Sequence, residues 1–149
     1  MEENNIKDFK SADDRIIPYF ESKPNNTTKD SIILVYEIFG MTDHIKNLSK
    51  KLANLGFLVN VPDIFSRIEK NVVLKYDKEG FTKGIALKEK LGWELPVMDI
   101  VGLAALLKKN YTVSIIGFCY GGSLSWLSIQ KSFIFDKAIC YYGSSIPEF

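Results

Sequence analysis

A strand, an amphipathic helix and a second strand follow one another in the first half of the chain. Residues 31–36 form a continuous run rich in β-branched side chains, which is typical of a strand covered on both faces. Thr42 or Asp43 can cap the helix that follows, and Gly56 can end it. Its apolar side chains recur at spacings of three and four, at Ile45, Leu48, Leu52 and Leu55. Residues 57–61 predict the next strand, and two strands joined by a helix run in the same direction, so the pattern predicts a parallel sheet.

The same alternation continues along the rest of the chain, after a hairpin that we predict over residues 6–20. The further predicted elements are a helix over 93–110, a strand over 112–116, a helix over 121–131 and a strand over 137–142. Residues 66–90 show no sustained period, and we expect an irregular excursion with some helix there. The predicted fold class is therefore α/β, with a mostly parallel sheet.

Composition limits the size and the partners of this domain. A chain of 149 residues suits one domain over residues 1–149, and 46% hydrophobic residues suffice for a core. The formal net charge of +1 gives no overall attraction to nucleic acid or to an anionic membrane. Two cysteines cannot build a disulfide framework, and neither a signal peptide nor a run of about 18 apolar residues occurs. We therefore expect a cytoplasmic protein with a small-molecule partner.

The most informative motif is Gly-Phe-Cys-Tyr-Gly-Gly at residues 117–122, between a predicted strand and a predicted helix. In a tight strand-to-helix turn the backbones before and after the central residue come together, so small residues are needed there. Gly117, Gly121 and Gly122 meet this requirement around Cys119. The turn would expose the thiol at the carboxyl edge of the sheet, above a helix start that favours thiolate. The alternative is that Cys119 is a small buried residue in a glycine-rich turn.

Five patches of the sequence form an ordered set. They are Tyr36-Glu-Ile-Phe-Gly40 with His44-Ile45, then Gly56-Phe57, then Pro-Asp-Ile-Phe at 62–65 with Arg67, then the 117–122 motif, and finally Tyr142-Gly143. Together they resemble the signatures of the dienelactone hydrolases, or carboxymethylenebutenolidases. The resemblance implies a three-layer α/β-hydrolase fold with a mostly parallel sheet, and a cysteine nucleophile where most relatives use serine.

The resemblance also implies roles for four residues. Cys119 would be the nucleophile, and Glu37 would contact it in the resting enzyme. The backbone N–H groups of Ile38 and Tyr120 would form the oxyanion hole. Physical chemistry agrees, because a carboxylate at the end of a central strand can lie beside a thiol on the adjacent turn and modulate its ionisation. Substrate-binding residues are not identified, and neither a metal nor a cofactor is expected.

Other reactive or polar residues are predicted to have structural roles. His44, the single histidine, falls in the first turn of a predicted helix and is expected to be a surface or capping residue. Arg67 is more consistent with a loop anchor than with a ligand-binding group. Cys140 is expected in the core. One of Tyr141 and Tyr142 is expected to pack inward, because neighbouring residues of a strand alternate between its two faces.

The acid and the base of a hydrolase triad are not evident after Cys119. No histidine follows it, and of the two later carboxylates, Asp136 and Glu148, Asp136 precedes a predicted strand instead of following one. The resemblance implies that family members continue through two more strands, with the acid and the histidine downstream of the nucleophile. We therefore expect a truncated fold, incomplete at its C-terminal end, whose exposed apolar sheet edge invites a C-terminal fragment or self-association.

These features favour a hydrolase that attacks an ester or a lactone with Cys119 through an acyl-thioester intermediate. Turnover by this chain alone is expected to be poor, because the downstream Asp and His are absent. Two alternatives stay open. The chain is either a non-catalytic remnant or one half of a split hydrolase, or it is a thiol-based binding module.

Overall fold

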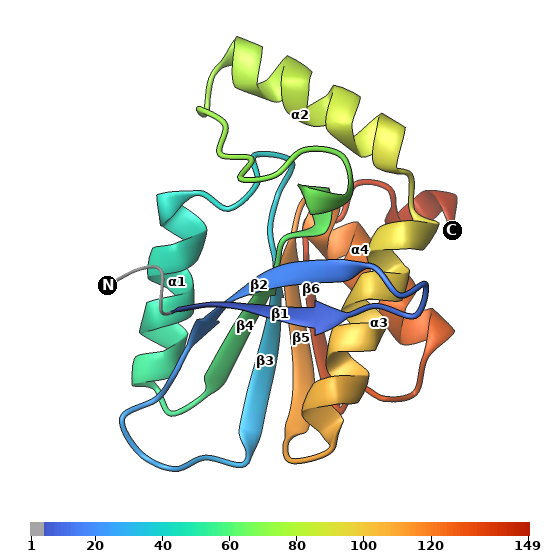
Figure 1. Cartoon of the computed structure of the whole chain (residues 1–149). Coiled ribbons are helices and arrows are strands. Elements are labelled where there is room, and N and C mark those ends of the chain that lie inside the picture. Colours follow the sequence, from blue (N-terminus) through green and yellow to red (C-terminus); the bar gives the residue numbers. More distant parts are fainter. Residues whose placement is uncertain (1–4) are drawn as a thin grey trace.

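The computed structural model describes residues 5–149 (Figure 1). These residues contain a six-stranded sheet in the order β1-β2-β4-β3-β5-β6. The strands are β1 Ile6–Lys10, β2 Ile16–Ser22, β3 Asp30–Val35, β4 Leu58–Pro62, β5 Thr112–Phe118 and β6 Lys137–Tyr141. The last four of these run parallel, whereas the β1–β2 hairpin joins β4 in the antiparallel sense. The predicted hairpin and the mostly parallel sheet are confirmed.

Helices cover both faces of the sheet, as Figure 1 shows. They are α1 Asp43–Asn54, α2 Lys78–Leu91, α3 Glu94–Lys108 and α4 Tyr120–Lys131, with short 3-10 helices at Ile64–Arg67 and Ile146–Glu148. The helix α1 packs on β2 and β4, whereas α3 and α4 pack together on the opposite face. The result is a three-layer α/β arrangement. No helix among residues 5–149 is both long enough and apolar enough to cross a membrane.

The helix α2 is more regular than the pattern of residues 66–90 indicates. It begins after Asp77, whose carboxylate accepts a hydrogen bond from the Gly80 N–H at 2.8 Å. Gly84 interrupts the apolar periodicity of this helix, and the reason is a contact with a distant part of the chain. A Cβ atom at this position would lie 2.5 Å from the Ile38 carbonyl oxygen. The helix lies across the carboxyl ends of the parallel strands (Figure 1) and packs against the turn that follows β3.

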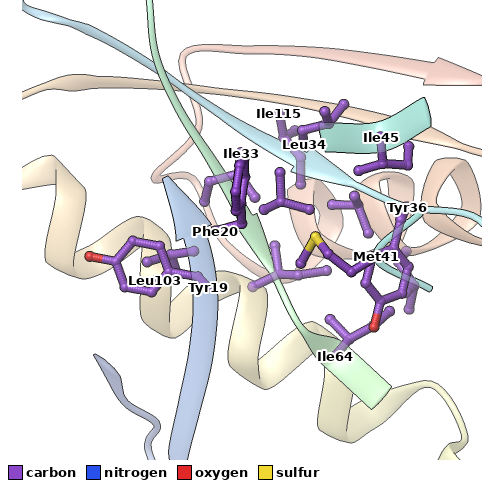
Figure 2. Close-up of a cluster of buried hydrophobic side chains, with 14 of the residues drawn as sticks. Tyr19, Phe20, Ile33, Leu34, Tyr36, Met41, Ile45, Ile64, Leu103 and Ile115 are labelled. Atoms are coloured by element: carbon purple, nitrogen blue, oxygen red, sulfur yellow. The ribbon is translucent and has the colours of Figure 1, made fainter. Parts of the chain in front are cut away.

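The core forms where β3 meets side chains from both helical layers. After Asp30, all five remaining residues of β3 are buried, which confirms the prediction of a strand covered on both faces. Figure 2 shows Ile33 and Leu34 of this strand in one cluster with Phe20 of β2 and Ile45 of α1. Close packing of this kind leaves little freedom for the strand to shift. The turns at the carboxyl end of the sheet therefore rest on a rigid base.

The strand β6 lies at one edge of the sheet and is bonded to β5 on one side. The side chain of Ile139 in this strand is 47% exposed. A groove of about 550 Å³ runs along the same part of the sheet, beside α1, and its apolar lining includes Ile32, Leu52, Phe57 and Ile139. An exposed apolar edge is thus present among the described residues, as expected.

Two predictions about this end of the chain are wrong. Cys140 is half-buried and not part of the core, because an edge strand has a neighbouring strand on one side alone. Tyr141 and Tyr142 are both exposed, at 46% and 64%. The strand ends at Tyr141, so the alternation on which the inward position was predicted does not reach Tyr142.

The Arg67 cluster, formed by Arg67, Asp13, Asp99 and Ser11, ties distant segments together. Arg67 donates to both oxygens of Asp99 at 2.7 Å and to both oxygens of Asp13 at 2.8 and 2.9 Å. Ser11 donates to Asp99 at 2.6 Å. The cluster joins the β1–β2 turn, the 3-10 helix after β4 and α3. The prediction that Arg67 is a loop anchor is confirmed.

Candidate active site

Cys119 occupies a strained turn between the last residue of β5 and the first residue of α4. Its backbone has φ 56° and ψ −117°, a combination that is uncommon for any residue other than glycine. The side chain is half-buried. Such strain persists where the surrounding structure imposes it, and it is frequent at functional sites. We call residues 117–122 the elbow.

Three glycines of the elbow leave room for close backbone contacts. A Cβ atom on Gly117 would overlap the Gly121 carbonyl, and one on Gly121 would overlap the Val35 carbonyl of β3. A Cβ atom on Gly122 would overlap the Tyr141 carbonyl at the end of β6. The glycines thus let α4 start directly against the ends of its two neighbouring strands, which explains why three of them stand at these positions.

The start of α4 is also fixed by hydrogen bonds and by aromatic packing. The Cys119 N–H donates to the Tyr141 carbonyl at 3.0 Å, which bonds the elbow to the end of β6. The ring of Tyr120 is buried against Phe65 and Trp93, and its hydroxyl donates to the Gly92 carbonyl at 2.9 Å. Burial raises the pKa of Tyr120, so its hydroxyl stays protonated as a donor.

Glu37 lies in the turn after β3, next to a buried tyrosine that holds this turn in place. The Tyr36 hydroxyl donates to Asp63 at 2.8 Å and accepts from the Phe65 N–H at 2.9 Å. Burial raises the pKa of Tyr36 well above its usual value, and the nearby Asp63 carboxyl adds to this effect. Two of the sequence patches, 36–40 and 62–65, are therefore joined through one buried hydroxyl.

The Glu37 carboxylate has a hydrogen-bond partner that the sequence reasoning did not identify. The Tyr142 hydroxyl, just beyond β6, donates to Glu37 Oε1 at 3.3 Å. Burial raises the pKa of Tyr142, and the negative charge of Glu37 raises it further. Among residues 5–149 no hydrogen bond joins Glu37 to the Cys119 thiol. The neighbouring tyrosines Tyr141 and Tyr142 were the one feature of the sequence that pointed to a hydrogen-bond partner for Glu37.

The two amides expected to form an oxyanion hole lie at two turns on the same edge of the sheet. Ile38 follows β3 and Tyr120 follows β5, and these strands are parallel neighbours. Neither N–H group has an acceptor among residues 5–149. The first N–H groups of a helix have no partner within it, so the Tyr120 amide is available to an external oxygen. The Ile38 side chain is buried, which fixes this residue under α2.

His44 and Asp136 lie outside this arrangement. His44 is exposed on α1, where the capping residue is Thr42, so the expected surface position is confirmed.

Asp136 accepts from the Val113 N–H at 2.8 Å and from Lys108 at 2.7 Å, near the starts of β5 and β6 and at the opposite end of these strands from Cys119. Hydrogen bonds from Lys108 and from the Val113 N–H lower the pKa of Asp136. Residues 5–149 hold no group of three or more His, Cys, Asp or Glu side chains suited to bind a metal ion.

A family model described as "Dienelactone hydrolase family" matches residues 17–148, which is most of the chain. The chain belongs to this family. A carboxymethylenebutenolidase of Rhodococcus opacus is 29% identical over 113 residues, covering 75% of this chain and 43% of that protein. A Synechocystis protein assigned as a carboxymethylenebutenolidase is 28% identical over 121 residues, covering 78% of this chain and 49% of its own length. The chain thus spans about half the length of the curated relatives it matches.

Solved structures share the fold of this family member. A Klebsiella pneumoniae protein assigned as a dienelactone hydrolase superposes with a TM-score of 0.77 at 23% identity, covering 92% of this chain and 58% of that one. Est1E from Butyrivibrio proteoclasticus superposes with a TM-score of 0.69 at 14% identity, covering 97% of this chain and 54% of that one. The fold is therefore that of the α/β-hydrolases, as the sequence resemblance implies.

Proposed function

We propose that this chain carries the nucleophile of a hydrolase that cleaves an ester or a lactone, with Cys119 as the attacking group. The observation that carries the proposal is the strained backbone of Cys119 on a glycine elbow, in a member of a hydrolase family. The unpaired amides of Ile38 and Tyr120 support it, because a developing oxyanion needs donors that are already in place.

The proposed reaction has two stages. The thiolate sulfur of Cys119 attacks the carbonyl carbon, and the carbonyl π electrons move to the oxygen, where the Ile38 and Tyr120 amides stabilise the charge. When the carbonyl re-forms, the C–O bond to the alcohol breaks and the alkoxide leaves with a proton from solvent. Water then adds to the thioester, and this releases the carboxylic acid and regenerates the thiol. In a lactone, the leaving alcohol stays attached to the acyl group.

Deacylation is the stage that the residues of this chain assist least. Activation of a water molecule by a general base contributes about 10²- to 10⁴-fold, and the single histidine lies on the surface of α1. We propose that a segment outside the described residues 5–149 supplies the acid and the histidine and pairs with β6 as a further parallel strand. The unpaired edge of β6, the apolar groove beside it and the greater length of the relatives support this assignment.

Acylation can be tested with p-nitrophenyl acetate and intact-protein mass spectrometry. We expect a burst of p-nitrophenol with one acetyl group on Cys119, followed by slow release. Cys119→Ala should lose both signals, whereas Cys140→Ala is a matched control that should keep them, because Cys140 is also a half-buried free thiol. Absence of an acetyl group on Cys119 would overturn the proposed nucleophile. Alkylation of this thiol without acylation would favour the thiol-based binding module instead.

Complementation by the second segment needs its own experiment. The segment proposed to pair with β6 is prepared as a separate polypeptide and added to this chain, and steady-state ester hydrolysis is measured against its concentration. We expect saturable turnover that Cys119→Ala abolishes and that Ile139→Lys weakens, because a charge would then lie on the β6 edge. Ile16→Lys is the control, since Ile16 is 58% exposed at the other side of the sheet. Dimerisation of this chain through β6, or no Cys119-dependent turnover in the mixture, would contradict the assignment.

A further inference from the structure

The helix α3 is apolar over most of its surface, including the side that it turns toward α4. Its inner face packs on the sheet through Ile100, Leu103 and Ala104, all of which are fully buried. Met98 and Val101, on the side toward α4, are also apolar but are half-buried. A surface helix normally carries polar residues outside its inner stripe, and a helix that is apolar all round is normally buried. The composition of α3 therefore indicates that a further surface covers it.

A groove of about 440 Å³ lies between α3 and α4, which stand side by side in Figure 1. Its walls are apolar, with Met98 and Val101 from α3 and Leu127 from α4. Trp93 and Phe149 line the end of the groove where α3 begins, and their rings meet edge to face at 5.1 Å. A contiguous apolar surface that a single copy leaves half-exposed is typical of an interaction site.

Two groups of opposite charge stand at the rim of this groove. Glu94 lies in the first turn of α3, and Lys131 is the last residue of α4. Since α3 leads into β5 and α4 leads from β5 to the parallel strand β6, both helices run away from the carboxyl end of the sheet. Glu94 and Lys131 therefore mark opposite ends of the groove. Neither side chain has an ion pair or a hydrogen bond within residues 5–149.

We propose that this groove is the interface of a symmetric dimer, in which α3 and α4 of one copy pack on α3 and α4 of a second copy. A two-fold axis brings the same surface of both copies together, so a contact between two different residues occurs twice. With the helices of the two copies crossing in opposite directions, Glu94 of each copy meets Lys131 of the other. The apolar side chains between these charges are then buried. Opposite charges at the two ends make the groove complementary to itself, and this favours a second copy over an unrelated partner.

The dimer leaves the other proposed interface free. The helices α3 and α4 cover one face of the sheet, whereas the groove beside β6 lies on the face that α1 covers in part. A second copy on α3 and α4 is therefore compatible with a further strand at β6. Its formation does not depend on the chemistry of Cys119, so the dimer and the proposed hydrolase can fail separately.

A charge exchange tests the predicted contact between the two ends of the groove. Sedimentation equilibrium of the full chain gives the dissociation constant of the dimer. Glu94→Lys and Lys131→Glu each bring like charges together twice, and we expect each to weaken the dimer about tenfold. The double variant restores opposite charges and should return the dissociation constant to within about twofold of the wild type. This recovery is expected where residue 94 of one copy contacts residue 131 of the other.

A second variant tests the apolar part of the interface. Val101→Asp places a carboxylate between the two copies, and we expect association about a hundredfold weaker. Leu55→Asp is the matched control, because Leu55 is an exposed apolar residue at the end of α1, on the other face of the sheet. It should leave the dissociation constant unchanged. Thermal melts identify any variant that fails to fold.

Three results would overturn the proposal. The first is a monomer at every concentration, which would leave the groove to the segment proposed to pair with β6. The second is a dimer that Ile139→Lys dissociates, because the two copies would then meet through the β6 edge. The third is a double charge variant that associates no more tightly than the single ones, because Glu94 and Lys131 would then not meet.

Discussion

The Arg67 cluster and the elbow with Glu37 and Tyr142 are two polar regions of opposite character. In the Arg67 cluster, one guanidinium donates four hydrogen bonds, which reach both oxygens of the Asp13 and Asp99 carboxylates. The Arg67 side chain is 4% exposed. In the elbow region one hydrogen bond of 3.3 Å joins two side chains that solvent reaches, and two backbone amides have no acceptor among residues 5–149.

The difference shows how stability and reactivity are separated in this protein. Charged groups that are fully hydrogen-bonded to one another have no donors or acceptors left for a ligand. Removing one partner of such a buried ion pair costs much stability. Unpaired donors and a strained backbone cost free energy in the resting state but can stabilise a transition state. Mutations in the two regions should therefore have opposite signatures, with stability lost at Arg67 and chemistry lost at Cys119.

The largest effect on stability should come from breaking the buried ion pair. Arg67→Met leaves the Asp99 carboxylate, which is 0% exposed, without its cation. We expect the free energy of unfolding in urea to fall by about 3–5 kcal/mol. Arg15→Met is the control, because the Arg15 side chain makes one exposed hydrogen bond, to the Arg67 carbonyl, and the substitution should change stability by less than about 0.5 kcal/mol. Equal effects of the two substitutions would show that the cluster is no anchor.

A smaller loss should follow from filling the space inside the elbow. Gly121→Ala places a methyl group against the Val35 and Tyr36 carbonyls, so the start of α4 must move. We expect a loss of about 1–3 kcal/mol in urea unfolding together with slower acylation of Cys119. Gly102→Ala, in the middle of α3, has 3.4 Å to its nearest neighbour and should be neutral or slightly stabilising. Normal stability of Gly121→Ala would contradict the close packing of the elbow.

The strain at Cys119 predicts a difference in stability between two substitutions that both remove the nucleophile. Glycine adopts a positive φ without penalty, so Cys119→Gly should be more stable than Cys119→Ala by about 1 kcal/mol, although both variants lose acylation. Thermal unfolding of the two variants under identical conditions measures the difference. If Cys119→Ala is the more stable of the two, the turn is not strained, and the contrast with the Arg67 cluster fails.

The smallest effect should appear in acid. A hydrogen bond from Arg67 lowers the pKa of Asp13 to about 2, from an ordinary value of 3.8. A carboxyl group whose pKa is lowered by folding stabilises the protein above its unfolded pKa, and this contribution is lost as the pH falls toward 2. We expect Asp13→Asn to lose less stability than the wild type between pH 4 and pH 2, as measured by urea unfolding. Identical slopes would show that Asp13 does not contribute.

Local patterns in the sequence predicted much of the fold. The apolar run at 31–36, the spacing of Ile45, Leu48, Leu52 and Leu55, and the glycines around Cys119 depend on backbone sterics and on periods of two or 3.6 residues. These signals operate over a few residues, so they can be seen without tertiary structure. The helix α2 was harder to predict, because the glycine at position 84 is needed for a close contact with the Ile38 carbonyl. Ile38 lies 46 positions earlier in the chain, so no local pattern indicates this contact.

By itself, the sequence determined the order along the chain of the strands and of α1, α3 and α4, together with the parallel sheet and the glycine turn around Cys119. Tertiary structure alone decided which side chains meet: Tyr142 with Glu37, 105 positions apart, and Arg67 with Asp13 and Asp99, 54 and 32 positions apart. The physical reason is that a turn or a helix depends on neighbouring residues. A hydrogen bond between distant side chains depends instead on strand order and register, which exist once the sheet has formed.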